Sequence, residues 1–331
     1  VERGNRVFPV SDHSSDVTKA LERAMDQAGV KVLLQTEVKD IRTHGEQVAG
    51  VEVKRRGSGG ERHREHTEVL PADAVIVATG GISYPTTGST GDGYGWAKRL
   101  GHGLVDTRPA LVPMAALEDY IPAMQGLSLR NVTLRIRDQR GRELYREFGE
   151  MLFTHFGVSG PLMIELSSHL PEETGAVRVT LDMKPALTDQ QVDQRLQREF
   201  AQHARSQLST VLTGLMPVRM GPVFAGLCGL SAETPVSQIS RGQRLALGRN
   251  LNELPLPVSG KRPIEEAIVT RGGVNVKEIE PGTMMSRCVP GLFFAGEVLD
   301  VDAHTGGFNL QIAFSTGALA GISAASWSRG E

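Results

Sequence analysis

The chain alternates between stretches with helical and with strand-like spacing of apolar residues. Apolar side chains recur every three or four positions from Val17 to Ala28, between a polar start at Ser14 and the helix-ending Gly29, which predicts a helix. Short apolar runs beside turn residues predict strands. We expect strands at 30–34, 38–41, 48–53 and 74–78, followed by a helix over 91–100. This order is typical of an α/β nucleotide-binding domain.

The pattern changes after Pro109. Short alternating segments predict antiparallel strands at 132–136, 162–166 and 177–181. Thr188 and Gln191 have the spacing of a capping box, so we expect a helix from there to about residue 207. Further helical sequence follows, up to a proline-rich stretch at 255–257.

Strand-like segments and glycine turns return from residue 269, with a strand expected at 292–295 and a helix over 310–327. A discontinuous organisation explains this order most simply. We predict one α/β domain built from residues 1–110 and 269–331, with an inserted domain at 111–268 that is β-rich over 111–183 and helical over 186–254.

The uncharged segment 310–327 is nearly as long as a membrane span. Gln311, Thr316 and Ser323 are among its many polar residues, so it is too polar to favour lipid. We expect a buried, glycine-rich helix instead.

Charge and cysteine content narrow the partners. The 331 residues carry 36 basic and 38 acidic side chains, a net charge of −2, which argues against nucleic acid or an anionic membrane as the main partner. Cys228 and Cys288 form no Cys-x-x-Cys pair, so a disulfide framework and a cysteine zinc site are excluded. A reducing, cytoplasmic setting and a small-molecule substrate fit best.

Three glycine-rich elements could carry chemistry. Apolar strands end abruptly at Thr79-Gly80-Gly81 and at Gly296-Glu297, and ligands bind at the carboxyl ends of strands in open α/β sheets. A third element, Thr305 to Gln311, opens the last helix, where Asn309 can cap and free N–H groups attract an anion. Taken singly, each strand–glycine junction is better explained as a tight turn after a core strand. The third element has a simpler explanation as a glycine-rich helix entry that serves only packing.

Together the three elements resemble the FAD-dependent flavoproteins whose FAD domain has two parts. The chain is similar in particular to the BaiN-like NAD(P)/FAD-dependent oxidoreductases, also called HI-type conserved flavoproteins. The motifs that carry this resemblance follow the family order along nearly the whole chain: Arg6-Val-Phe-Pro9, Ala78-Thr-Gly-Gly-Ile-Ser-Tyr-Pro85, Gly88-Ser-Thr-Gly-Asp-Gly-Tyr94, Phe153-Thr-His155 with Ser159-Gly-Pro161, Thr270-Arg-Gly-Gly-Val274, Gly296-Glu-Val-Leu-Asp300 and Thr305-Gly-Gly-Phe-Asn-Leu-Gln311.

The resemblance implies a role for each matching position toward FAD. Val38 would contact the adenine through its backbone, and Thr79, Gly80 and Gly81 would line the adenosine side. Gly296 and Glu297 would lie at the ribityl and pyrophosphate region, where a carboxylate accepts hydrogen bonds from hydroxyls. The turn formed by Gly307, Phe308, Asn309, Leu310 and Gln311 would present N–H groups to the pyrimidine edge of the flavin, where negative charge builds on reduction.

The sequence departs from the family at the pyrophosphate site. The family begins with a strand, a G-x-G-x-x-G turn and a helix that hold the pyrophosphate, and this sequence contains no such motif. We therefore expect an N-terminally truncated Rossmann-like domain with an exposed sheet edge, and weak or no FAD binding by residues 1–331 alone.

The sequence gives only weak candidates for a catalytic acid. Tyr84, His155 and His304 lie in predicted loops and could each move a proton. For Tyr84 and His304 we favour the simpler role of pocket wall, and for His155 that of a loop histidine bonded to backbone. His102 follows a predicted helix end. The nine histidines form no H-E-x-x-H or similar cluster, so we expect no metal site.

The resemblance implies a flavin-dependent oxidoreductase in which NAD(P)H reduces FAD and an organic acceptor, such as an activated C=C bond, takes the electrons. One alternative is a flavin-dependent amine oxidase that uses dioxygen. The other is a non-catalytic nucleotide-binding fragment, which the missing phosphate-binding turn favours.

Overall fold

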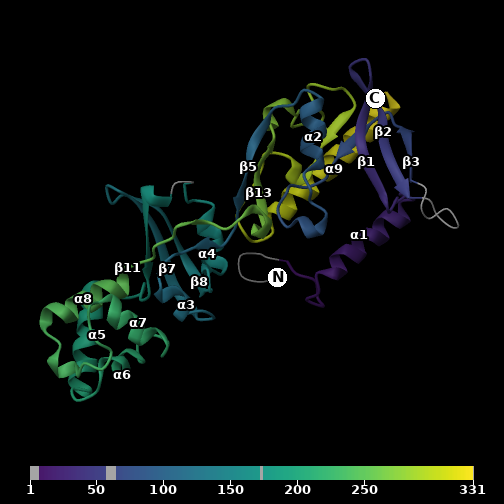
Figure 1. The fold of residues 1–331 in the computed structure, drawn as a ribbon. Helices are drawn as coiled ribbons and strands as arrows, with labels where there is room; N and C mark the ends of the chain where they lie inside the picture. The colour runs from purple at the N-terminus through teal and green to yellow at the C-terminus, as the bar shows by residue number, and fades with distance from the viewer. Residues whose placement is uncertain (1–6, 57–64, 172–173, 331) are drawn as a thin grey trace. The chain divides into compact units, whose positions relative to one another are not determined.

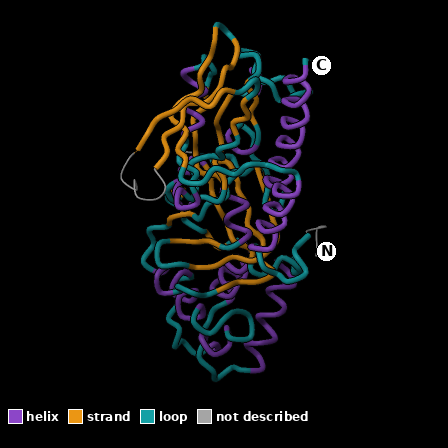
Figure 2. The backbone as a smooth tube through the Cα atoms, turned by 90° about the vertical axis from the view of Figure 1, so that its right-hand side faces the viewer, coloured by secondary structure: helices purple, strands orange, loops and turns teal. Residues whose placement is uncertain are grey.

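The computed structural model describes residues 7–56, 65–171 and 174–330 of the chain (Figures 1 and 2). It forms two compact units. Unit 1 consists of Val1–Arg108 and Thr270–Glu331, and unit 2 of Pro109–Val269. The chain passes between the units along strands β5 and β13, which pair with each other. The charged, glycine-containing sequence from Arg55 to His66 predicts a hairpin tip, and residues 57–64 of it lie outside the described residues.

The described part of unit 1 holds a three-stranded antiparallel sheet, a short parallel strand pair, the β5–β13 pair and three helices (Figure 1). Its elements are α1 (Ser15–Gln27), β1 (Thr36–His44), β2 (Gln47–Arg56), β3 (Glu65–Pro71), β4 (Val75–Val77), α2 (Asp92–Arg99), β5 (Leu104–Ala110), β13 (Val269–Val274), β14 (Leu292–Phe294) and α9 (Phe308–Arg329), with short 3₁₀ turns at η2 (Pro85–Thr87), η6 (Val276–Glu278) and η7 (Gly296–Val298).

The core of unit 1 forms around β4 and β14. The three residues of each strand pair in parallel, from Leu292 with Val75 to Phe294 with Val77, and all three β14 side chains are buried. Helix α9 packs beside both strands. This parallel sheet has two strands in the described part of the chain, and Ile76 is 38% exposed.

Unit 2 is built on a mixed-length antiparallel sheet, as the alternating segments predicted. The strand order is β11-β10-β7-β8-β9-β6-β12. Its strands are β6 (Met114–Ala115), β7 (Ser128–Asp138), β8 (Glu143–Phe153), β9 (Gly157–Ser159), β10 (Val177–Asp182), β11 (Leu254–Pro255) and β12 (Gly260–Lys261). Leu134 and Ile136 of β7 face the core and are fully buried, whereas Arg135 and Arg137 alternate with them and face the other side.

Helices cover one part of this sheet and extend beyond its β11 edge (Figure 1). They are α3 (Tyr120–Ala123), α4 (Pro161–Ser167), α5 (Asp189–Gln202), α6 (Leu208–Leu212), α7 (Met220–Leu227) and α8 (Arg241–Asn252), with 3₁₀ turns at η3 (Thr174–Ala176), η4 (Val236–Gln238) and η5 (Ile264–Glu266). The predicted capping box opens α5: Thr188 Oγ1 accepts the Gln191 N–H, and the Gln191 side chain accepts the Thr188 N–H.

Two predicted strands are wrong. Residues 30–34 form no strand, and Leu34 is 82% exposed, because no described strand lies beside this segment to pair with it. Residues 162–166 belong to helix α4, which starts with Pro161 after the positive φ of Gly160. Pro at the first helical position has its φ preset and needs no N–H there, so the local start signal overrides the strand-like apolar run.

The C-terminal helix is also less buried than predicted. Only Ala320 and Ala324 of α9 are buried, while Leu310, Phe314 and Ile322 are exposed. Its many small residues contact the strands on one side and leave the rest of the helix uncovered. Among the described residues, no helix is long and apolar enough to cross a membrane.

His102 follows the end of α2, as predicted, but it is also buried. Its Nε2 lies 2.8 Å from Ser286 Oγ, and its ring meets Phe294 edge-on at 4.9 Å. Ser286 Oγ already accepts the N–H groups of Cys288 and Val289, so its own proton is left to donate to His102 Nε2. Burial lowers the pKa of His102, because the charged imidazolium loses its hydration.

We expect the buried neutral His102 to make unit 1 less stable in acid. Because the folded pKa lies below the unfolded value of about 6.5, the unfolded state binds more protons as pH falls through that value. Urea unfolding at pH 7.5 and pH 5 should show the loss, and His102→Gln should reduce it. His203→Gln, at an exposed position, serves as the control. An equal pH dependence in all three proteins would contradict the assignment.

Candidate functional site

The two predicted strand–glycine junctions lie side by side in unit 1. Phe294 pairs with Val77 in the parallel register, and the Ala295 N–H donates to the Val77 carbonyl at 3.0 Å. Just beyond these strands, each of the two segments turns at a glycine with left-handed backbone, φ +74° at Gly80 and +75° at Gly296. The carboxyl ends of the two strands therefore open onto one place.

Glu297 holds three separate segments together at this place. Its Oε1 accepts the Thr270 N–H at 2.7 Å and the Ser83 hydroxyl at 3.1 Å. Thr270 Oγ1 in turn accepts the N–H groups of Ile82 and Ser83 at 2.9 and 3.0 Å. The other carboxylate oxygen, Oε2, accepts no hydrogen bond from a described residue, so it is available to a ligand hydroxyl.

Ser83 and Thr270 are site residues that the sequence did not single out. Both lie inside the motifs quoted for the family resemblance, but neither residue type at that spacing signals a role. Thr270 is fully buried and Ser83 nearly so. Their hydrogen bonds join positions 187 and 188 residues apart, which no local pattern encodes.

The N-terminal half of α9 lies beside the second junction. The Gly296 N–H donates to Thr316 Oγ1 of α9 at 2.9 Å. The helix begins after Gly307, and no side chain caps it. Its first backbone hydrogen bond runs from the Gln311 N–H to the Gly307 carbonyl. The positive end of the helix dipole is thus left available to an electron-rich group.

Asn309 does not cap this helix, contrary to the sequence prediction. Its Oδ1 accepts the Ala303 N–H at 2.9 Å, and its Nδ2 donates to the carbonyls of Ala303 at 2.9 Å and His304 at 3.4 Å. The amide is therefore used to close the loop that precedes the helix. An ion pair also fixes this loop, with Arg271 Nη2 at 2.8 Å from Asp302 Oδ2. The loop is held in place from both sides.

Thr79 and Val38 can contact a ligand mainly through backbone. The Thr79 hydroxyl is buried without a hydrogen-bond partner and lies against Gly93 of α2, where a Cβ would come within 2.3 Å of it. Val38 is half-buried on β1 and packs against the core.

We expect Thr79→Val to stabilise unit 1 by up to about 1 kcal/mol, because it removes an unpaired buried hydroxyl. Thermal unfolding measures this, and flavin affinity should not change.

Two of the three candidate acids belong to unit 1 and one belongs to unit 2. Tyr84 of unit 1 adopts φ +50° just before η2 and is 55% exposed, which is an uncommon backbone for a bulky residue. His304, also in unit 1, is exposed in the loop before α9. His155 belongs to unit 2, where it is exposed and meets Phe156 edge-on at 5.0 Å.

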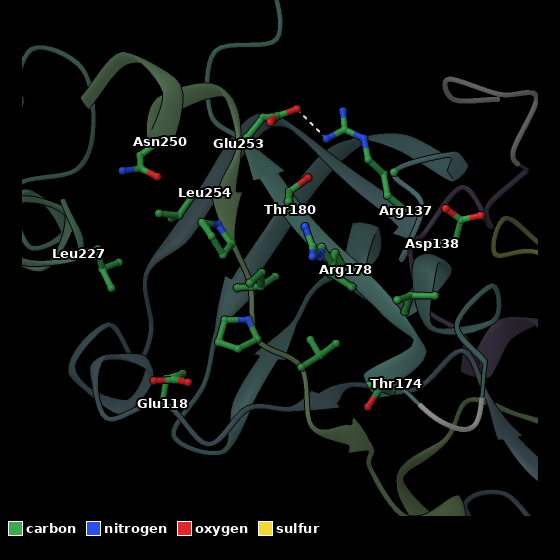
Figure 3. Close-up of a pocket in the computed structure, with 18 of the residues that line it drawn as sticks. Glu118, Arg137, Asp138, Thr174, Arg178, Thr180, Leu227, Asn250, Glu253 and Leu254 are labelled. Carbon is green, nitrogen blue, oxygen red and sulfur yellow. Dashed lines mark hydrogen bonds and ion pairs between the residues drawn. The ribbon is translucent and has the colours of Figure 1, made fainter. Parts of the chain in front are cut away.

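Unit 2 has a hollow of about 810 Å³ that the sequence did not predict (Figure 3). It opens at the β10–β11 edge between apolar residues such as Leu254 and polar groups on the sheet. There Arg137 Nη1 and Glu253 Oε1 form an ion pair at 2.6 Å, which Figure 3 marks as a dashed line. The Thr180 hydroxyl nearby is buried without a hydrogen-bond partner, and Arg178 forms no ion pair with a described residue.

Comparison with known proteins gives one family and several relatives. The HI0933-like protein Rossmann domain matches residues 1–323. The 3-dehydro-bile acid delta(4,6)-reductase of Clostridium scindens is 30% identical over 327 residues, which cover 98% of this chain and 76% of the reductase. The ribosomal RNA dihydrouridine synthase of Haemophilus influenzae is 29% identical over 309 residues, 92% of this chain and 71% of the synthase. The Escherichia coli synthase of the same name is 31% identical over 245 residues, which cover 74% of this chain and 58% of the synthase.

Proposed function

Because the chain belongs to the HI0933-like family, we propose that it reduces a carbon–carbon double bond conjugated to a carbonyl group, with NAD(P)H as the source of electrons. Membership confirms the resemblance predicted from the motifs and identifies the chain as an FAD-dependent oxidoreductase with a Rossmann-type domain. The further choice of acceptor and electron donor is our proposal.

The shared chemistry of the relatives supports this acceptor. A 3-dehydro bile acid with delta(4,6) unsaturation has double bonds conjugated to its 3-oxo group, and its reductase removes such unsaturation. Dihydrouridine differs from uridine by a saturated C5–C6 bond, and in uridine that double bond is conjugated to the C4 carbonyl. Both named reactions thus add hydrogen to an activated C=C bond.

The donor groups of unit 1 suit FAD. Glu297 Oε2 would accept a ribityl hydroxyl while Oε1 stays bonded to Thr270 and Ser83. The backbone at Gly80 and Gly296 approaches without a Cβ, which suits the adenosine and ribityl–pyrophosphate sides. The uncapped turn of α9, from Gly307 to Gln311, would donate N–H groups to the pyrimidine edge. When bound, FAD supplies hydride transfer; the chain supplies position and charge.

Reduction of a conjugated double bond also needs a proton for the carbon that does not receive hydride. We propose Tyr84 as its donor, because its loop is fixed on one side by Ser83 and on the other by Thr87, whose N–H and hydroxyl both donate to the Tyr84 carbonyl. His304 is the second candidate, on the loop that Asn309 closes.

Anaerobic reduction of the FAD-loaded protein tests the proposed function. NADPH or NADH should bleach the flavin absorbance, and a cyclic enone should then restore it. An amine that bleaches the flavin where neither nucleotide does would identify an amine oxidase instead. FAD is supplied in large excess, so that even weak binding by residues 1–331 loads the site. A protein that takes up no flavin under this condition would support the non-catalytic module and overturn the proposal.

A second acceptor, uracil in RNA, is favoured by the two synthases among the relatives. Reduction of uracil uses the same chemistry on the same type of bond, a C=C bond conjugated to a carbonyl group. Incubation of the reduced protein with a steroid enone and, separately, with ribosomal RNA distinguishes the two, since only one reaction should reoxidise the flavin at a saturable rate.

A further inference from the structure

The polar face of the unit 2 sheet carries a second hollow, of about 570 Å³, at the end opposite the one in Figure 3. Strand alternation places Thr133 and Arg135 of β7 on this face. Directly opposite them, in the antiparallel register, lie Phe148 and Arg146 of β8. Lys184, two residues beyond Asp182 of β10, completes the lining on the other side.

The charges in this hollow are not balanced. Arg130, Arg146 and Lys184 line it, and among the described residues no carboxylate does. Arg146 and Lys184 form no ion pair with a described residue, and Arg130 has only a long one, 3.8 Å to Glu150. Asp182 lies opposite Thr133 on β10, but its oxygens accept from the Arg135 guanidinium at 2.8 Å and from the Lys184 N–H at 2.9 Å. The first hollow differs, because Glu253 neutralises Arg137 there (Figure 3).

Two further observations indicate a ligand. The side chain of Thr133 is 1% exposed and lines the hollow, yet its hydroxyl makes no hydrogen bond to a described residue. Burial, with Arg195 nearby, lowers the pKa of Lys184, so its charge is poorly solvated where it lies. An anion in the hollow would satisfy both groups.

The ring of Phe148 specifies the kind of anion. It is 46% exposed, lies two positions from Arg146 on the same face of β8, and lines the hollow with the cations. An exposed aromatic ring beside arginine and lysine suits a planar base joined to a phosphate.

We propose that this hollow binds a nucleotide unit, with its phosphate at Arg146 and Lys184 and its base stacked on Phe148. The nucleotide has two sources, a free mononucleotide or dinucleotide, or one residue of a single-stranded RNA. Arg178 of β10 lies opposite Arg137, which is four residues, or about 13 Å, along β7 from Thr133. On a bound RNA, Arg178 would therefore contact the phosphate of a neighbouring nucleotide. This inference does not depend on flavin chemistry.

Binding of AMP and of a labelled 12-nucleotide single-stranded RNA to the whole protein tests the proposal. Arg146→Ala and Lys184→Met should each weaken binding at least tenfold, and Phe148→Ala about fivefold or more. Thr133→Val should weaken it without loss of stability. Arg198→Ala is the matched control, since Arg198 is an exposed arginine of α5 away from the hollow.

Arg178→Ala separates the two sources. If RNA is the ligand, this variant should bind RNA several-fold more weakly and leave AMP binding unchanged. If a free nucleotide is the ligand, AMP should bind as tightly as RNA, and Arg178→Ala should affect neither. The proposal is overturned if the wild-type protein binds neither probe, or if the Arg146 and Lys184 variants bind like the Arg198 control.

Discussion

Replacing Glu297 by alanine is expected to lower both flavin affinity and the stability of unit 1. The fully buried Thr270 N–H would lose its acceptor at 2.7 Å, and an unsatisfied buried donor costs about 1–3 kcal/mol. The loop that carries Ser83 would lose a bond as well. We expect FAD to bind at least tenfold more weakly, measured by quenching of flavin fluorescence, and the urea midpoint to fall.

Glu297→Gln separates the two effects. The glutamine retains a carbonyl oxygen that can accept from Thr270, so stability should stay near that of the wild type while the negative charge is lost. The flavin affinity of Glu297→Gln should lie between that of the wild type and that of Glu297→Ala. If Glu297→Ala binds FAD as the wild type does, Glu297 has only a structural role.

Replacing Tyr84 by phenylalanine is expected to slow substrate reduction by about 100-fold, because general acid catalysis contributes 10²–10⁴-fold. Stopped-flow reoxidation of the reduced flavin by an enone measures the step. Flavin content and reduction by NAD(P)H should remain unchanged, since the ring and the left-handed backbone at this position are retained.

His304→Gln is the matched comparison for Tyr84→Phe. A wild-type rate in Tyr84→Phe with a slow His304→Gln would move the proton donor to the loop before α9. Wild-type rates in both variants would exclude each of them as the donor.

Local signals predicted those elements that depend on local chemistry. The capping box at Thr188 and Gln191 specifies a helix start by itself, and α5 begins there. The prediction failed where the outcome depends on distant partners. The apolar run at 30–34 looks like a strand, but a strand needs a neighbour to accept its hydrogen bonds, and Leu34 lies exposed.

The candidate site was predictable in its backbone and less so in its side chains. Strands that end at glycine indicated the junctions at Gly80 and Gly296, because such ends meet at one edge of a parallel sheet. The network around Glu297 was not visible, since the bonds that join Ser83 to Glu297 and to Thr270 span the whole inserted unit. Asn309 illustrates the same limit: its residue type suits a cap, but the loop before it competes for the amide.

The pairing of β4 with β14 sets an order of events during protein synthesis. Val75 leaves the ribosome long before its partner Leu292, and all of unit 2 is made between them. Unit 2 is a continuous segment with its own core, so it can fold before the second part of unit 1 has been synthesised. Strand β4 therefore has no partner strand until β14 has been synthesised, and this is the interval in which a chaperone would protect it.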